Sequence, residues 1–140
     1  FEVVIFDGIP ITEQEEIMKD AAIAIGVHGA NLVNCIFQPA WTVVLELMPY
    51  GFDHEMYEEG GAAGLKYFKH YVRTGVEYED RHAYTSTEEC VRKDVKCKVH
   101  YRDHSVTLTE EDLDGIAGLL GQSFTWLESA VELGLIGYQE

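Results

Sequence analysis

The sequence has no apolar run long enough to cross a bilayer. No stretch approaches the roughly 20 residues that a membrane-spanning helix needs, and residues 1–20 do not have the layout of a secretory signal peptide. The chain also starts without a methionine, inside the strand-like run of residues 1–8. We interpret it as a globular piece of a longer protein.

Basic residues are scarce as well. The chain has 10 Lys and Arg against 25 Asp and Glu, a net charge of -15. This charge disfavours nucleic acid or an anionic membrane as the main partner, because an acidic surface is repelled by both. Nine of the basic residues lie between positions 66 and 102, and none follows, so we interpret residues 105–140 as an acidic solvated face.

Two common motifs of α/β enzymes are missing. The stretch Gly26-Val27-His28-Gly29 does not supply the G-x-G-x-x-G pattern of dinucleotide-binding proteins, and no nucleophile elbow is present. These absences argue against a dehydrogenase or an α/β hydrolase. No internal repeat or low-complexity tract is present either.

The first half of the chain alternates strand and helix patterns. Hydrophobic residues make up 46% of the 140 residues, which suits one domain with a sizeable core. Strand-like runs alternate with helices, the first of which is capped by Thr12 with Glu15 three positions on. The pattern predicts strands at 2–6, 23–27 and 42–47, with helices from residue 12 and at 31–37. We therefore expect an α/β fold with a parallel sheet flanked by helices.

The second half is less regular. Its apolar spacing predicts a helix at 54–64, a strand at 65–72, a loop or insertion at 74–97, an extended segment at 98–108, and a C-terminal helix at 109–130 capped by Thr109.

His28, Gly29 and Ala30 stand where a predicted parallel strand gives way to a helix. Ligands of open α/β sheets bind beyond the carboxyl ends of the strands, and phosphates settle at helix starts. Gly29 would let the backbone approach a diphosphate, and His28 would donate a hydrogen bond to it. The alternative is a turn glycine beside a histidine satisfied within the protein.

Glu46 lies in an otherwise apolar strand. A carboxylate there must be paired or must face a ligand, for example the hydroxyls of a ribose or sugar. The alternative is a glutamate at the strand edge that faces water or a lysine.

Three other groups are candidates for function. Asp112 and Asp114 have the D-x-D form of a metal site, but they fall in the first turn of a capped helix, where acids are expected. A zinc site formed by Cys90, Cys97, His100 and His104 is disfavoured, because their spacing matches no usual zinc finger and because His100 and His104 would lie about 13 Å apart in an extended segment. Trp41 could pack within the protein or stack on a uracil base, and the sequence leaves both roles open.

The segment IAIGVHGANLVNCIFQPAWTVVLELMPYGF, residues 23–52, resembles the signature of glycosyltransferase family 61. That family has H-G-A-x-L-x-N, then Phe, a Pro-containing loop, and an apolar strand with Glu. The matching positions are His28, Gly29, Ala30, Leu32, Asn34, Phe37, Pro39 and Glu46. The likeness continues at residues 49–67 and 100–113, although strong identity is confined to about 23–50.

The resemblance implies the Rossmann-like, C-terminal half of a GT-B enzyme, with residues 1–140 as its nucleotide-sugar-binding domain. The reaction would be inverting and would need no metal and no cofactor. UDP-GlcNAc is the favoured donor, and a UDP-pentose is the alternative. His28, Gly29, Ala30 and Asn31 would line the diphosphate, with Glu46 near the nucleoside or sugar.

The resemblance also implies an acceptor, which would be a protein or glycan hydroxyl. The general base, and an arginine to bind the phosphates, would come from the missing N-terminal part of the protein. The catalytic residues therefore stay unknown, and the fragment alone would be inactive. Family members are secretory, which implies the endoplasmic reticulum or Golgi lumen and makes a Cys90–Cys97 disulfide plausible. The alternative function is a Rossmann-like binding module without catalysis.

Overall fold

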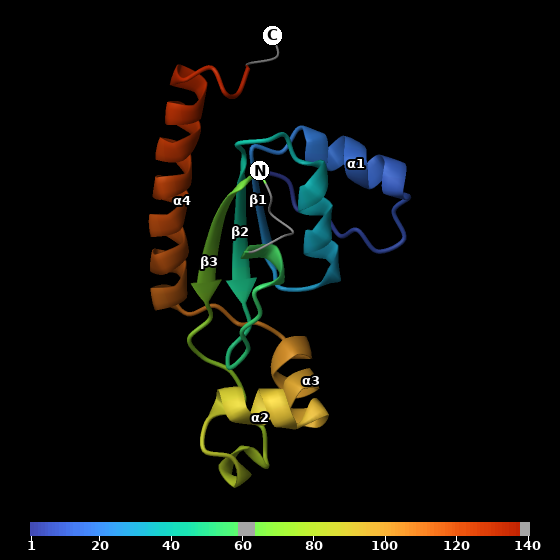
Figure 1. The fold of residues 1–140 in the computed structure, drawn as a ribbon, viewed down its shortest axis with the longest axis vertical. Helices are drawn as coiled ribbons and strands as arrows, with labels where there is room; N and C mark the ends of the chain where they lie inside the picture. Colours follow the sequence, from blue (N-terminus) through green and yellow to red (C-terminus); the bar gives the residue numbers. More distant parts are fainter. Residues whose placement is uncertain (59–63, 138–140) are drawn as a thin grey trace.

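The computed structural model describes residues 1–58 and 64–137. Its centre is a parallel sheet with strand order β1-β2-β3, formed by β1 (Ile23–Val27), β2 (Val43–Met48) and β3 (Lys66–Tyr71) (Figure 1). All three were predicted as strands, and the expected α/β fold with a parallel sheet flanked by helices is confirmed.

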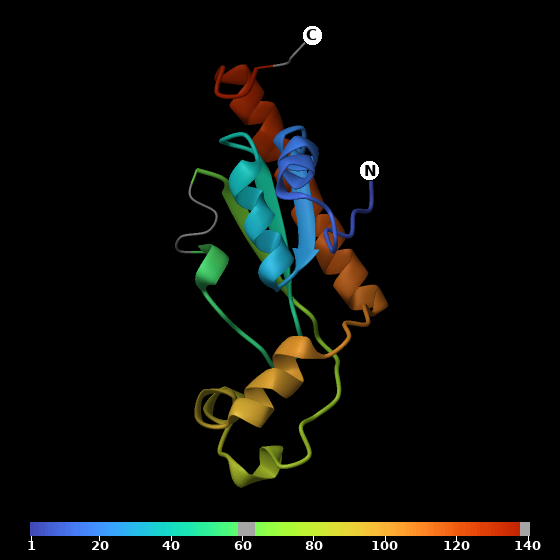
Figure 2. The same ribbon diagram turned by 90° about the vertical axis from the view of Figure 1, so that its right-hand side faces the viewer.

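Helices cover both faces of the sheet (Figure 2). On one face, Leu45 and Leu47 of β2 pack against Ile116 of α4 (Glu110–Glu132). On the other, Val44 packs against the helices α1 (Ile11–Lys19) and η1 (Ala30–Phe37). Every residue of β2 is buried, which explains why its sequence is apolar without alternation, apart from Glu46.

The N-terminal segment differs from the prediction in two ways. Residues 2–6 do not form a strand, because β-branched side chains alone cannot replace a hydrogen-bonded neighbour; Val3 and Ile5 are exposed. Helix α1 begins at Ile11 behind Pro10, not at Thr12. Proline holds φ near its helical value (-58° here), so it starts the helix and the Thr12 cap prediction is wrong.

Beyond the carboxyl ends of β2 and β3 lie η3 (Arg81–Ala83), α2 (Thr87–Lys93) and α3 (Val95–Asp103) (Figure 1). We call residues 81–103 the helical module. The loop predicted at 74–97 is therefore wrong for the residues in these helices, and the extended segment predicted at 98–108 is wrong through Asp103. Side-chain caps cause the difference: Ser86 accepts from Glu89 N, and Asp94 accepts from the amides of Lys96 and Cys97.

The helical module has its own small core. Cys90 and Cys97 are joined in a disulfide with Cα atoms 5.9 Å apart, at the positions proposed from the resemblance. They pack with Met48, Phe52 and Tyr101, so the last residue of β2 and the loop after it enter this core.

Helix α4 corresponds to the helix predicted at 109–130, and Thr109 caps it as expected. Asp112 completes the capping box and also accepts from Arg73 N and bonds His70 Nε2 at 3.0 Å. Burial raises the pKa of Asp112, but hydrogen bonds from Thr109, His70 and Arg73 outweigh it and hold the pKa well below its usual value. This contact ties α4 to β3.

Of the helix predicted at 54–64, residues 59–63 lie outside the described part, residues 56–58 are helical, and residues 54, 55 and 64 are not. Among the residues that the structure describes, no helix is both long and apolar enough to span a membrane.

Candidate functional site

The predicted site lies at the carboxyl end of β1. His28 N donates to Leu47 O at 2.9 Å, so the ladder between β1 and β2 extends to His28. Gly29 then precedes η1, and Ala30 and Asn31 are exposed in its first turn. The strand-to-helix junction predicted for this segment is therefore present.

Glu46 and His28 form a buried pair. His28 Nδ1 lies 2.6 Å from Glu46 Oε1, and the Glu46 side chain is fully buried. The Tyr67 hydroxyl donates to the other carboxylate oxygen. The alternative of a strand-edge glutamate is wrong because β2 is the central strand. Contact of Glu46 with a donor stays a prediction, since both oxygens are already engaged within the protein.

These contacts fix the chemistry of the His28 ring. A carboxylate only accepts, so Nδ1 carries a proton and Nε2 is the ring nitrogen that faces away from Glu46. Burial and the hydrogen bond to Glu46 raise the pKa of Tyr67 well above its usual value, so Tyr67 remains a neutral donor. Glu46 thus orients His28 and fixes which nitrogen faces the other way.

The backbone at Gly29 is held but uncrowded. Its carbonyl accepts from the Tyr57 hydroxyl at 2.6 Å. Its φ of 165° is extended, and the nearest atom to an added Cβ would be Val27 O at 3.9 Å. Nothing in the described structure therefore requires glycine here, and any such requirement would come from a molecule that approaches the backbone.

Three aromatic rings surround His28 that sequence reasoning missed. The ring centroids of Phe52, His54 and Tyr57 lie 5.2, 5.6 and 5.8 Å from that of His28. Phe52 and His54 come from the loop after β2, and Tyr57 comes from the short helical turn at 56–58 that follows it. Their aromatic character and their place just past a buried strand are the signals that could have identified them.

A lysine next to this loop already has its positive charge balanced by two carboxylates. Lys69 Nζ bonds Asp53 at 3.0 Å and Glu58 at 3.1 Å. Burial lowers the pKa of Lys69, but these two hydrogen bonds outweigh it and raise the pKa above its usual value. An anion beside His28 would therefore rely on His28, on backbone N–H groups, or on a cation from elsewhere.

Trp41 lies at the other end of the sheet. It precedes β2, whereas His28 follows β1, and parallel strands place these positions at opposite ends. Trp41 has φ 71°, rare for a bulky residue, and its backbone is held by Gly64 O and by Trp126 Nε1. Base stacking by Trp41 on a ligand at His28 is therefore excluded, and packing against Trp126 remains.

His100 and His104 were expected to be far apart in an extended segment, and that premise is wrong. His100 lies in the last turn of α3 and His104 is its C-cap residue, and their ring centroids lie 5.3 Å apart. His100 Nε2 bonds Val76 O at 2.7 Å. Cys90 and Cys97 are engaged with each other, so the four residues do not converge on one point.

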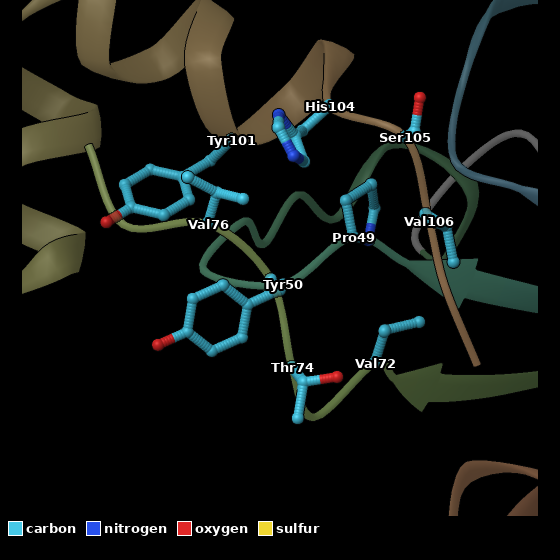
Figure 3. A pocket seen from close by; sticks show the side chains of 10 residues that line it. Pro49, Tyr50, Val72, Thr74, Val76, Tyr101, His104, Ser105 and Val106 are labelled. Atoms are coloured by element: carbon cyan, nitrogen blue, oxygen red, sulfur yellow. The ribbon is translucent and has the colours of Figure 1, made fainter. Parts of the chain in front are cut away.

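Two hollows lie away from His28. A small pocket at the junction of the sheet and the helical module is lined by Tyr50, Val72, Tyr101 and their neighbours (Figure 3). A wider apolar groove at the amino end of the sheet is lined by Trp41 and by Phe124 and Leu127 of α4. Neither includes His28 or Gly29, so the candidate site is defined by contacts instead.

Comparisons with known proteins support the resemblance. Residues 1–45 match the family model described as Glycosyltransferase 61. Protein O-linked-mannose beta-1,4-N-acetylglucosaminyltransferase 2 of Xenopus laevis is 42% identical over 41 residues, which is 29% of this chain and 7% of that relative. The family match contains His28, Gly29, Ala30 and Asn31 and ends one residue before Glu46. The likeness quoted for residues 49–67 and 100–113 stays a prediction.

Proposed function

We propose that this chain supplies the nucleotide-sugar-binding part of a glycosyltransferase. The observation that carries the proposal is the His28–Glu46 pair beside the start of η1, at the carboxyl end of β1. Ligands of open α/β sheets bind at this end, and phosphates bind at helix starts. His28 also lies inside the segment that matches the glycosyltransferase family.

The proposed reaction is an inverting displacement in a GT-B arrangement. An acceptor hydroxyl of a protein or glycan attacks the anomeric carbon, and the nucleoside diphosphate leaves with the bonding electrons. With Nδ1–H held by Glu46, the imidazolium form of His28 offers a second N–H, at Nε2, to the leaving diphosphate. We place the general base outside this chain, in an N-terminal domain.

The donor we favour is UDP-GlcNAc, because the relative named above transfers N-acetylglucosamine. A UDP-pentose is the alternative donor. We propose that transfer needs no divalent metal, and that the protein works in the lumen of the endoplasmic reticulum or Golgi, where the Cys90–Cys97 disulfide would persist.

Calorimetric titration of the full-length protein with UDP tests the proposal, with and without a chelator. We expect His28→Ala to weaken UDP binding about tenfold or more, since a charge-assisted hydrogen bond is lost. His82→Ala is the matched control, because His82 is exposed in the helical module. Equal affinities of the two variants would contradict the role of His28, and UDP binding without sugar transfer would favour a non-catalytic binding module.

A further inference from the structure

We infer that His54 is a second histidine of the donor site and donates a hydrogen bond from Nε2 to the diphosphate. The inference rests on the function proposed for His28. It does not follow from the family match, which ends at residue 45.

The position of His54 suits this role. Its ring centroid lies 5.6 Å from that of His28, so one diphosphate can contact both rings. Phe52 lies parallel to the His54 ring, at 6.3 Å and 9°, and is itself buried. His54 is exposed, whereas the His28 side chain is nearly covered. The accessible ring of the pair is therefore His54.

The two rings offer opposite chemistry. Met56 N–H donates to His54 Nδ1 at 3.1 Å, so Nδ1 is an acceptor and the neutral ring carries its proton on Nε2. In His28 the proton is on Nδ1, toward Glu46. His54 thus presents an N–H at Nε2 with a single ring proton, whereas His28 presents one at Nε2 only as the imidazolium described above.

The loop that carries His54 is anchored on both sides. Lys69 Nζ bonds Asp53 at 3.0 Å and approaches His54 O at 3.5 Å. Phe52 packs in the core of the helical module. These contacts hold the backbone of His54 beside the sheet, which a positioned hydrogen-bond donor requires.

Three substitutions separate the donor from a role in the turn. Gln at position 54 places an amide N–H near the position of Nε2 but loses the acceptor for Met56. Asn keeps an acceptor for the amide two residues on, as in an Asx turn, but cannot reach the ligand. Ala loses both. Calorimetric titration with UDP is performed on the full-length wild type, His54→Gln, His54→Asn, His54→Ala and His28→Ala.

We expect His54→Asn and His54→Ala to bind UDP about tenfold more weakly than the wild type, and His54→Gln to bind at least fivefold more tightly than His54→Asn. Affinity of His54→Asn equal to or above that of His54→Gln would overturn the inference. If only His28→Ala weakens binding, the inference fails and the proposed function stands. If the wild type does not bind UDP, both fail.

Discussion

The sheet and the helical module are stabilised in different ways. In the sheet, all of β2 is buried between helices, and the buried polar contact at its centre is that of Glu46 with His28 and Tyr67. In the helical module most side chains are at least partly exposed. That module depends on a disulfide and on side-chain hydrogen bonds, including those of Asp94.

This difference matters because the candidate site lies at the border between them. His28 and Glu46 belong to the sheet, whereas Phe52 leaves the sheet and packs in the core of the helical module. His54 follows two residues later and lies beside His28. The positions of His28 and Glu46 are therefore set by the sheet, whereas the position of His54 depends on how Phe52 packs in the helical module.

The largest effect is expected for Glu46→Ala. The substitution leaves the nearly covered His28 side chain and the partly buried Tyr67 without their shared acceptor, and we expect it to lower the free energy of unfolding by about 3–5 kcal/mol. Urea unfolding measures the change. The matched control is Glu58→Ala, whose exposed carboxylate bonds Lys69 and should contribute about 1 kcal/mol or less. Equal losses of unfolding free energy would mean that the buried contacts of Glu46 contribute no more to stability than an exposed ion pair.

Gly51→Ala tests the border itself. Gly51 has φ +71°, and an added Cβ would lie 2.5 Å from Tyr101 Cδ1 of the helical module. We expect a loss of about 2–4 kcal/mol from backbone strain and overlap together. Gly134 has the same φ of +71° with nothing within 4 Å of an added Cβ, so Gly134→Ala isolates the strain. Equal losses of thermal stability in the two variants would show that Tyr101 moves aside at no cost in free energy.

Replacing Cys90 and Cys97 by Ser tests whether the module is a separate unit. For so short a loop, chain entropy gives a loss of about 2.5 kcal/mol. We expect hydrogen exchange to accelerate in α2 and α3 while the amides of β2 stay protected. Reduction of the wild type with a dithiol should reproduce the pattern. Equal acceleration in β2 would make the sheet and the module one cooperative unit.

The smallest effect is expected at Asp112, which joins α4 to the sheet. Its pKa is lowered in the folded state, so its stabilisation is present above the unfolded pKa, near 4, and is lost as the pH falls through the folded value. Asp112→Asn keeps a capping side chain and should cost about 1 kcal/mol at pH 7. Unfolding measured from pH 7 down to pH 2 should show this difference shrink. A difference independent of pH would mean that the charge of Asp112 contributes nothing.

The sheet could be predicted because burial on both faces leaves a direct trace in the sequence. The apolar runs at 23–27 and 42–47 coincide with β1 and β2 to within one residue. The helical module leaves no such trace, because its helices are short and polar. Its caps were visible: Ser86 with Glu89 three positions on, and Asp94 just before α3. Local capping was the signal to follow there, not hydrophobic periodicity.

The site was predicted in part for a similar reason. His28 and Glu46 were each recognisable as unusual in an apolar context, but their contact depends on strand register. Gly26 lies opposite Glu46, and this register brings His28 diagonally next to the carboxylate. His54 comes from a loop that is anchored by Lys69 and by Phe52 in the core of the helical module, and Tyr57 comes from the helical turn after it. No short sequence pattern encodes these contacts.

The placement of Trp41 decides which optical signal can follow this protein. The chain has two tryptophans, and Trp41 and Trp126 have ring centroids 6.4 Å apart at the end of the sheet that His28 does not occupy. A strand of this length separates the two ends by about 20 Å. Tryptophan fluorescence will therefore report whether Trp126 of α4 stays packed against Trp41 in the loop before β2. A change in tryptophan emission when a nucleotide binds at His28 would mean that binding changes the structure at the opposite end of β2.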